Sequence, residues 1–403
     1  MKRIKKLIVL FLLLPSLNCL AVTVRTYKSV TEMVSDKTIK NGDVLETINY
    51  YDYINGGGGR YIVAKTADDN DFTVNLKNGL CAILQHDNNV NVLQLGVKND
   101  QSQDCSSIIN RAIEKLAVKG GTLFFPIGIY LVSQIKINNP VILRGDESSY
   151  WNQGTMFFCH SKEDMVIIDA QNVRIENIFF VGNQYDNTAI KAVGSQNRSG
   201  LHINNVHINK FKTGIYTDKF FLSRVNNSRC ANCETGICVS NATSFFLQQC
   251  WTLVCGTGYS INKSTYVEMM GCCSDECEIG YNLISVKGIE LHSCACEVSK
   301  KIPLYISDNS VATINNFVGY KNNKFQYEST SLVYAENSVV TLTGCCDRDK
   351  YIDPVSKGGC TNTVKTVNSL LTIQGCNFSG LVSKDKKSSA IGSYYKNGKI
   401  VIL

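Results

Sequence analysis

The sequence is poor in proline, tryptophan and histidine, which number five, two and five among 403 residues. Charged residues make up only 19% of the chain, and neither sign dominates, since 41 cations accompany 34 anions. The formal net charge of +7 gives a nucleic-acid partner little electrostatic support. After residue 21, no apolar run reaches the ~18 residues of a transmembrane helix, so no membrane span is predicted. Hydrophobic residues nevertheless reach 44%, which excludes global disorder.

Residues 1–21 have the composition of a secretory signal peptide. Four cations open the chain, a short apolar run follows from Leu7 to Leu14, and Pro15 ends it. We expect cleavage near Ala21 and a secreted or periplasmic protein. Removing the four cations lowers the net charge from +7 to +3, so the mature chain is only mildly basic.

Cysteine is abundant, with 18 copies, and its spacing is regular. Export would allow disulfides, but the cysteines recur every 22 residues together with glycine and large apolar residues. The columns are Cys250, Cys272 and Cys294; Cys233, Cys255 and Cys277; Gly214, Gly236, Gly258 and Gly280; and Ile203, Val225, Leu247, Met269 and Leu291. A period shared by several columns predicts a repeat architecture.

The spacing inside each repeat is that of short strands. Apolar residues alternate, as in Leu201-x-Ile203, and Asn, Gly and Ser separate the strands. A parallel β-helix fits this pattern, with coils of about 22 residues stacked ~4.8 Å apart. We predict one continuous β-helix over residues 140–395, in which buried thiols fill inward columns. Stacked Cβ atoms are slightly too far apart for disulfides, although a bridge within a rung, such as Cys230 with Cys233, stays open.

One helical stripe precedes the repeat. Apolar residues in 104–119 follow helical spacing, after a candidate N-cap at Asp104 or Ser106 and before Gly120 and Gly121. This helix is expected to cover the open N-terminal end of the β-helix. Residues 121–130 are predicted to form the first strands, and residues 22–95 a small β-rich leader.

Two segments resemble the entry to pectate-lyase-like β-helices of the phage tailspike, or polysaccharide depolymerase, type. They are Gly96-Val97-Lys98-Asn99-Asp100 and, after the helix, Gly120-Gly121-Thr122-Leu123-Phe124-Phe125-Pro126; Gly42-Asp43-Val44 and Asn78-Gly79-Leu80 in the leader are similar too. The resemblance implies an all-β fold with a right-handed parallel β-helix over residues 96–403, activity on polysaccharide, and often a homotrimer. Tailspikes carry no signal peptide, so the expected one favours an exported relative. No catalytic residue transfers by motif.

The repeat register itself predicts a ligand-binding surface. If Leu201 and Ile203 point inward, His202 points outward. Its column contains Arg174, His202, Arg224, Phe246, Glu268 and Glu290, and a second outward column contains His207, Arg229 and Trp251. Arginine and histidine bind acidic groups, and aromatic rings can stack on sugars. We therefore predict that the seven cationic and aromatic residues of these columns bind substrate.

Glu268 and Glu290 are the predicted catalytic pair, as acid and as nucleophile or base. On adjacent rungs their Cβ atoms should lie ~4.8 Å apart, closer to the ~5–5.5 Å of retaining glycosidases than to the ~6.5–9.5 Å of inverting ones. Like charges this close favour protonation of one carboxyl, which suits a general acid. Seven other acids compete for the role, namely Asp164, Asp169, Asp186, Glu234, Asp275, Glu276 and Glu278.

Three classes of function stay open. The first is an exported glycosidase or lyase that cleaves a bacterial surface or extracellular polysaccharide, with an acidic polymer as one option. The second is an enzyme of polysaccharide maturation, such as an epimerase, and the third is a non-catalytic glycan-binding or surface β-helix. No ligand spacing predicts a metal site, and no cofactor is expected.

Overall fold

The structure is a computed structural model, and it describes residues 24–69, 72–116, 120–147, 154–183, 187–320, 331–347, 362–396 and 398–403. The predicted signal peptide and the candidate acid Asp186 lie outside the described residues.

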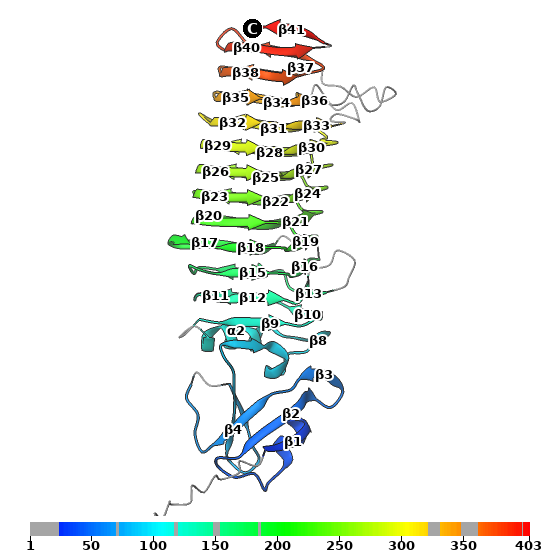
Figure 1. Cartoon of the computed structure of the whole chain (residues 1–403), viewed down its shortest axis with the longest axis vertical. Coiled ribbons are helices and arrows are strands. Elements are labelled where there is room, and N and C mark those ends of the chain that lie inside the picture. Colours follow the sequence, from blue (N-terminus) through cyan, green and yellow to red (C-terminus); the bar gives the residue numbers. More distant parts are fainter. Residues whose placement is uncertain are drawn as a thin grey trace, which may run out of the picture.

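The leader forms its own sheet below the coils (Figure 1). Its strands are β1 (Val24–Ser29), β2 (Val44–Tyr51), β3 (Ile54–Gly57), β4 (Arg60–Ala64), β5 (Thr73–Asn75) and β6 (Cys81–Leu84). The order is β1-β2-β4-β6-β5, with β3 on β2, and only β1 and β2 pair in parallel. A short helix that the sequence did not predict, α1 (Val30–Ser35), begins where the Ser29 hydroxyl accepts the Glu32 N–H at 3.1 Å.

The remaining strands form one wound sheet of 35 described strands, stacked in coils along the long axis (Figure 1). Each coil crosses three faces, which we name A, B and C in chain order. Face A contains β7 (Asn89–Asn91), β9 (Thr122–Phe125), β12 (Ile142–Gly145), β15 (Arg174–Glu176), β18 (His202–Asn204), the second half of β20 (Thr213–Asn226), β23 (Thr243–Gln248), β26 (Thr265–Met270), β29 (Lys287–His292), β32 (Val311–Asn315), β35 (Val339–Thr343), β38 (Leu370–Asn377) and β40 (Ser389–Lys396).

Faces B and C complete each coil. Face B contains β8 (Asp100–Asp104), β10 (Gly128–Val132), β13 (Thr155–Cys159), β16 (Phe179–Val181), β19 (His207–Asn209), β21 (Arg229–Ala231), β24 (Trp251–Leu253), β27 (Cys273–Asp275), β30 (Ala295–Glu297), β33 (Val318–Tyr320) and β36 (Cys346–Asp347). Face C contains β11 (Ile135–Ile137), β14 (Val166–Ile168), β17 (Thr188–Ser199), the first half of β20, β22 (Thr235–Ser240), β25 (Thr257–Asn262), β28 (Ile279–Ile284), β31 (Ile302–Ser307), β34 (Val333–Glu336), β37 (Asn362–Val367) and β39 (Leu381–Lys384). The last strand, β41 (Lys399–Ile402), pairs antiparallel with β40.

The pairing confirms the predicted β-helix and its register. The coil sheet nevertheless begins earlier than residues 121–130, because β7 pairs with β9 and β8 with β10. The cysteine column stacks as predicted, since the N–H groups of Cys273 and Ala295 each donate at 2.9 Å to the carbonyls of Cys250 and Cys272 one rung below. Equivalent residues therefore share one environment from coil to coil, which is the physical basis of the 22-residue period.

All sixteen described cysteines are free thiols, including Cys230 and Cys233. In the main column the thiols of Cys250, Cys272 and Cys294 are buried, and each contacts a backbone carbonyl of the preceding coil at 3.2–3.4 Å. A small apolar side chain with a weak donor suits this position, because it fills the core and satisfies a buried carbonyl.

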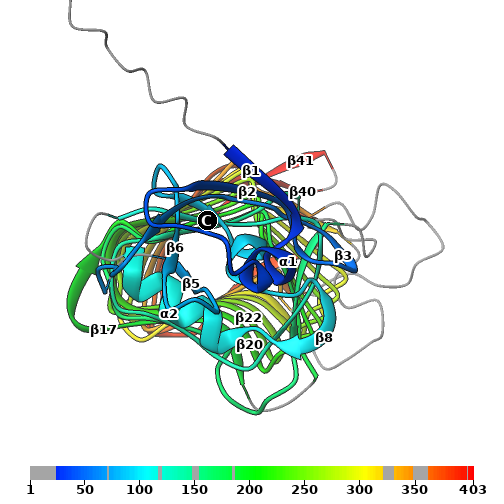
Figure 2. The ribbon, with the colours of Figure 1, turned by 90° about the horizontal axis from the view of Figure 1, so that it is seen from below.

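Helix α2 (Ser106–Leu116) lies between the leader and the first coils (Figures 1 and 2). Cys105 holds the N-cap position, because its carbonyl accepts the first helical bond from the Ile109 N–H at 3.0 Å; the Asp104 carboxylate, one residue earlier, accepts the Ser106 N–H at 2.9 Å. Ile109, Ala112, Ile113 and Leu116 are buried. The role of α2 in closing the β-helix stays a prediction. Among the helices that the structure describes, none has the length and apolar character needed to cross a membrane.

Candidate functional site

The predicted outward column forms a continuous ladder on face A. Pairing joins Arg174 to His202, His202 to Arg224, Arg224 to Phe246, Phe246 to Glu268 and Glu268 to Glu290. Each step is one rung, or ~4.8 Å. Three cationic or imidazole rungs therefore lie on one side of Phe246, and two carboxylates lie on the other.

A pocket of about 250 Å³ opens in the middle of this ladder. Arg224, Phe246 and Glu268 line it from the ladder, and Asn226, Gln248 and Met270 line it from the neighbouring outward column, with Leu247 between them. The Phe246 side chain is 44% exposed, so part of its ring is open to a ligand. The pocket thus offers an aromatic surface, amides, a cation and a carboxylate within three adjacent rungs, a combination that suits a sugar unit.

The two glutamates have different surroundings. Glu290 Oε2 lies 2.9 Å from His292 Nε2, and His292 Nδ1 lies 3.4 Å from Asn315 Nδ2. One neutral tautomer satisfies both contacts, because Nε2–H then donates to the carboxylate and Nδ1 accepts from the amide. Glu268 is half-buried above Phe246, and it forms no hydrogen bond or ion pair with any residue that the structure describes. The pair is therefore asymmetric, because Glu290 has a hydrogen-bond partner and Glu268 has none among the described residues.

Sequence reasoning missed His292, Asn315, Gln248 and Met270. They occupy the outward column two residues beyond the glutamate column on the same strands, as the pairing of Gln248 with Met270 and of Met270 with His292 shows. The signal was present, because residues i and i+2 of a strand share a face. Each face A strand carries two outward columns, and the prediction considered only the one that contains the glutamates.

His202 lies between two arginines on face A. Burial, and then the guanidinium groups of Arg224 and Arg174, lower the pKa of His202 below its ordinary value of 6.5, while Glu176 opposes the shift. The imidazole is therefore neutral near pH 7 and can accept a proton.

The second predicted column lies on face B, beyond the turn at the end of each face A strand. Pairing joins His207 to Arg229 and Arg229 to Trp251, as predicted. Burial, and then Arg229, lower the pKa of His207. The Arg229 guanidinium carbon lies 4.2 Å from the Trp251 ring centroid, and the indole N–H donates to Asp275 Oδ2 at 2.6 Å. These three predicted binding residues do not line the face A pocket, and one face of the Trp251 ring is already covered by a cation.

Most of the competing acids already have structural partners. Asp164 bonds Lys191 at 2.6 Å, Asp169 bonds Arg198 at 2.8 Å, and Glu278 bonds Lys301 at 2.7 Å. Glu276 occupies a left-handed turn with φ of 53°. Glu268, in contrast, lines a pocket, and its carboxylate forms no hydrogen bond or ion pair with any described residue.

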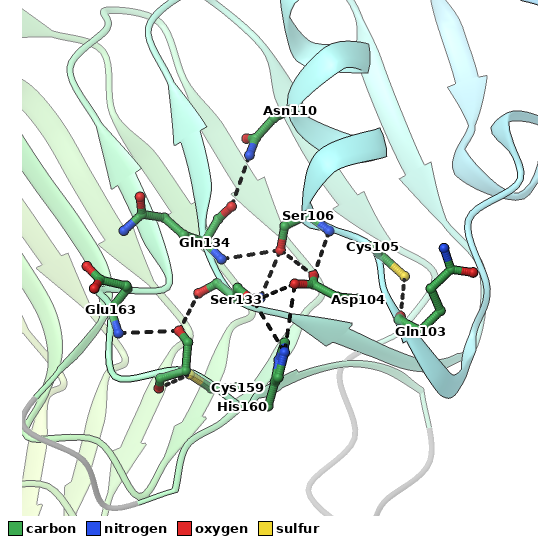
Figure 3. A network of polar contacts seen from close by, with 11 residues as sticks. Gln103, Asp104, Cys105, Ser106, Asn110, Ser133, Gln134, Cys159, His160 and Glu163 are labelled. Atoms are coloured by element: carbon green, nitrogen blue, oxygen red, sulfur yellow. Dashed lines mark hydrogen bonds and ion pairs between the residues drawn. The ribbon is translucent and has the colours of Figure 1, made fainter.

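A second polar cluster joins α2 to the first coils. In Figure 3, Ser106, Ser133 and His160 converge on Asp104. Burial acts to raise the pKa of Asp104, but hydrogen bonds from Ser106 and Ser133 outweigh it and lower the pKa overall. His160 Nε2 lies 3.3 Å from Ser133 Oγ and 3.8 Å from Asp104 Oδ2. A hydrolytic triad needs the carboxylate at the other ring nitrogen, so this cluster fits an anchor for the helix rather than a nucleophile.

Within the described residues, no group of three or more His, Cys, Asp or Glu side chains is placed to hold a metal ion.

Comparison with known proteins supports the fold. Residues 89–167 match the family model described as rhamnogalacturonase A/epimerase, pectate lyase-like. No curated protein matches the sequence. Among solved structures, the chain is similar to the gp42 tailspike of Acinetobacter phage vb_AbaP_AS12, with a TM-score of 0.73 and 17% identity over 95% of this chain and 76% of that one.

Two further structures carry a described activity. The tailspike gp49 of Acinetobacter baumannii bacteriophage Fri1, a capsular polysaccharide depolymerase, gives a TM-score of 0.62 at 11% identity over 91% of this chain and 76% of that one. The catalytic unit of an α-1,3-glucanase from Streptomyces thermodiastaticus gives 0.54 at 11% identity, over 78% and 72% of the two chains. At these identities the likeness establishes the fold and leaves the activity to the site itself.

Proposed function

From its right-handed, pectate-lyase-like β-helix fold of the tailspike type, we propose that this chain is an enzyme that cleaves a polysaccharide on face A. The stacking of Glu268 and Glu290 beside the pocket carries this proposal. The neighbouring structures include a capsular polysaccharide depolymerase and a glucanase, which supports the substrate class. The geometry favours a retaining glycosidase, because adjacent rungs hold the two residues ~4.8 Å apart.

The different surroundings of the two glutamates support a proposed division of roles. Glu290 accepts a hydrogen bond from His292, which stabilises its carboxylate and suits a nucleophile. Glu268 has no such partner among the described residues and lines the pocket beside Phe246, where its carboxyl can reach the glycosidic oxygen of a bound sugar, so we assign it the role of the acid.

The reaction then follows two displacements. Glu268 protonates the glycosidic oxygen, the bond to the leaving sugar breaks, and Glu290 attacks the anomeric carbon to form a glycosyl ester. Glu268, now a carboxylate, takes a proton from water. The water oxygen attacks the same carbon and releases Glu290.

A lyase is the second candidate, and the state of His202 favours it. A neutral imidazole between Arg174 and Arg224 can remove the proton next to a uronate carboxylate that the two guanidinium groups hold. An epimerase would begin with the same proton abstraction.

Product analysis tests the proposal. The purified mature chain is incubated with bacterial capsular and extracellular polysaccharides. New reducing ends without ultraviolet absorbance, formed with retention at the anomeric carbon by proton NMR, are the expected result. An unsaturated product would assign the reaction to the lyase, and binding without turnover would contradict an enzymatic function.

We further propose that the protein acts outside the cytoplasm, which rests on the predicted signal peptide. Mass spectrometry of the secreted or periplasmic protein checks for a mature N-terminus after Ala21. Light scattering of the same sample tests the homotrimer that the tailspike resemblance implies.

A further inference from the structure

A second groove of about 400 Å³ runs along the edge between faces C and A in the upper coils. It begins at Lys287 on β29, the strand that also carries Glu290, and ends at Lys387 in the coil above Leu370. Four rung steps separate β29 from β40, so the groove is ~19 Å long. We call it the upper groove.

An apolar column forms one wall of the upper groove. Val311, Val339 and Leu370 stack on successive rungs and are 40%, 43% and 55% exposed. The same column is polar below Val311, with Lys287 at the lower end of the groove and Thr265 and Thr243 on the rungs beneath it. Within this column, the exposed aliphatic side chains are therefore those that line the groove. A continuous apolar strip of this kind marks a surface that another molecule covers.

The opposite wall is a ladder of carboxamides. Asn309, Asn337 and Asn368 are exposed, and each occupies a left-handed turn with φ between 47° and 58°. Asn368 Nδ2 donates to Asn337 Oδ1 at 2.7 Å. This bond uses one of the donor hydrogens, so the amides keep further donor and acceptor positions for a ligand. Apolar C–H contacts on one side and amides on the other match the two kinds of surface that a sugar ring presents.

The charge of the groove is positive. Lys287 and Lys387 line it, and no acidic residue does. Three acids adjoin the groove residues along the chain, and each accepts hydrogen bonds. Asp308 accepts the Ser285 hydroxyl, Glu336 accepts the Tyr305 hydroxyl, and Asp385 accepts the Asn368 N–H and the Ser388 hydroxyl. The Lys287 ammonium also donates to the backbone carbonyl of Asn309, which holds it against the carboxamide wall.

A ladder of hydroxyls continues the glutamate column beside the groove. Thr313, Thr341 and Thr372 stack directly above Glu290. A chain lying on Glu268 and Glu290 therefore meets polar groups without interruption along face A up to the last coils.

We propose that the upper groove binds an acidic polysaccharide several sugar units away from the cleaved bond, as a distal subsite of the proposed active site. The chain lies along the axis from Glu290 toward Lys387, with C–H faces on the valine and leucine column and acidic groups near the two lysines. The inference rests on the proposed function, and it adds the sign of the substrate charge and the direction of the bound chain.

Paired substitutions test the groove without touching the glutamates. The variants are Val339→Gln with Leu370→Gln, and Lys287→Gln with Lys387→Gln. Val254→Gln, which alters another exposed valine outside both cavities, is the matched control. The probes are the polysaccharide that the parent chain cleaves and the short limit oligosaccharides of that reaction. Affinity for the polysaccharide is measured by titration calorimetry in the Glu268→Gln background.

The expected result is a loss of affinity for the polysaccharide, and a rise in KM, of about tenfold for each pair. The kcat and the affinity for limit oligosaccharides stay unchanged. The effect of the lysine pair shrinks at high salt, because exposed charges are screened. The proposal would be overturned if both paired variants kept the parental affinity and KM. It would also be overturned if a variant changed the oligomeric state and left the affinity unchanged, because the groove would then be an interface between copies of the chain. If the parent binds a polysaccharide without cleaving it, the proposed function fails, while the same affinity comparison still decides the groove.

Discussion

A substitution at Gly258 tests the repeat register through its effect on stability. It is the second residue of the face C strand β25 and is buried, and its backbone is not left-handed, so its role is steric. An added Cβ would lie 2.4 Å from Ser274 Oγ, 2.5 Å from Thr252 Oγ1 and 2.7 Å from the Gly280 carbonyl oxygen. Thr252 and Ser274 are fully buried on face B. The glycine column therefore recurs because the face C backbone passes close to the inward side chains of face B.

Gly258→Ala is expected to lower the free energy of unfolding by about 3 kcal/mol, the upper end of the usual cost of overpacking, because one of the atoms met is backbone. Urea unfolding followed by circular dichroism measures the loss. Gly375→Asn is the control: its φ is 62°, nothing lies within 4 Å of an added Cβ, and Asn205 and Asn316 hold the same left-handed conformation. It should change stability by less than about 0.5 kcal/mol. A Gly258→Ala chain as stable as the parent would refute the register and every site built on it.

Three further outcomes follow from the same structure. Burial and Arg229 lower the pKa of His207 below 6.5, so His207 takes up a proton more readily in the unfolded chain than in the folded one. The stability that neutral His207 contributes is therefore present above pH 6.5 and is lost as the pH falls below it. His207→Phe should flatten this part of the pH dependence of unfolding. Iodoacetamide labelling of the native protein, read by mass spectrometry, should spare Cys250, Cys272 and Cys294, and a disulfide among them would contradict the thiol ladder. Trp251→Ala should raise KM with little change in kcat if face B contributes to binding, and a matching loss in kcat would place this ring next to the chemistry instead.

The sequence was sufficient for the coil architecture because every rung repeats the same environment. The period of Gly258 and Cys272 placed Glu268 under Glu290 correctly. Features outside the period escaped prediction: α1 has six residues, too few for a helical stripe, and β7 precedes the first clear repeat.

The separation of Trp251 from the pocket could not be predicted either. Periodicity fixes which residues stack along the axis, but it does not fix the angle between faces A and B. The geometry of the turn between these faces decides which outward columns share a cavity.

The rate of polysaccharide cleavage by Glu268→Gln and Glu290→Gln tests the central claim most directly. Glu278→Gln is the matched control, because this exposed glutamate, which directly precedes strand β28, pairs with Lys301 and lines neither of the two cavities. We expect each of the two site variants to lose turnover by a factor of about 10² to 10⁴ with an unchanged urea midpoint, while the control keeps the parental rate. If both site variants cleave a confirmed substrate at the parental rate, face A is not the active site.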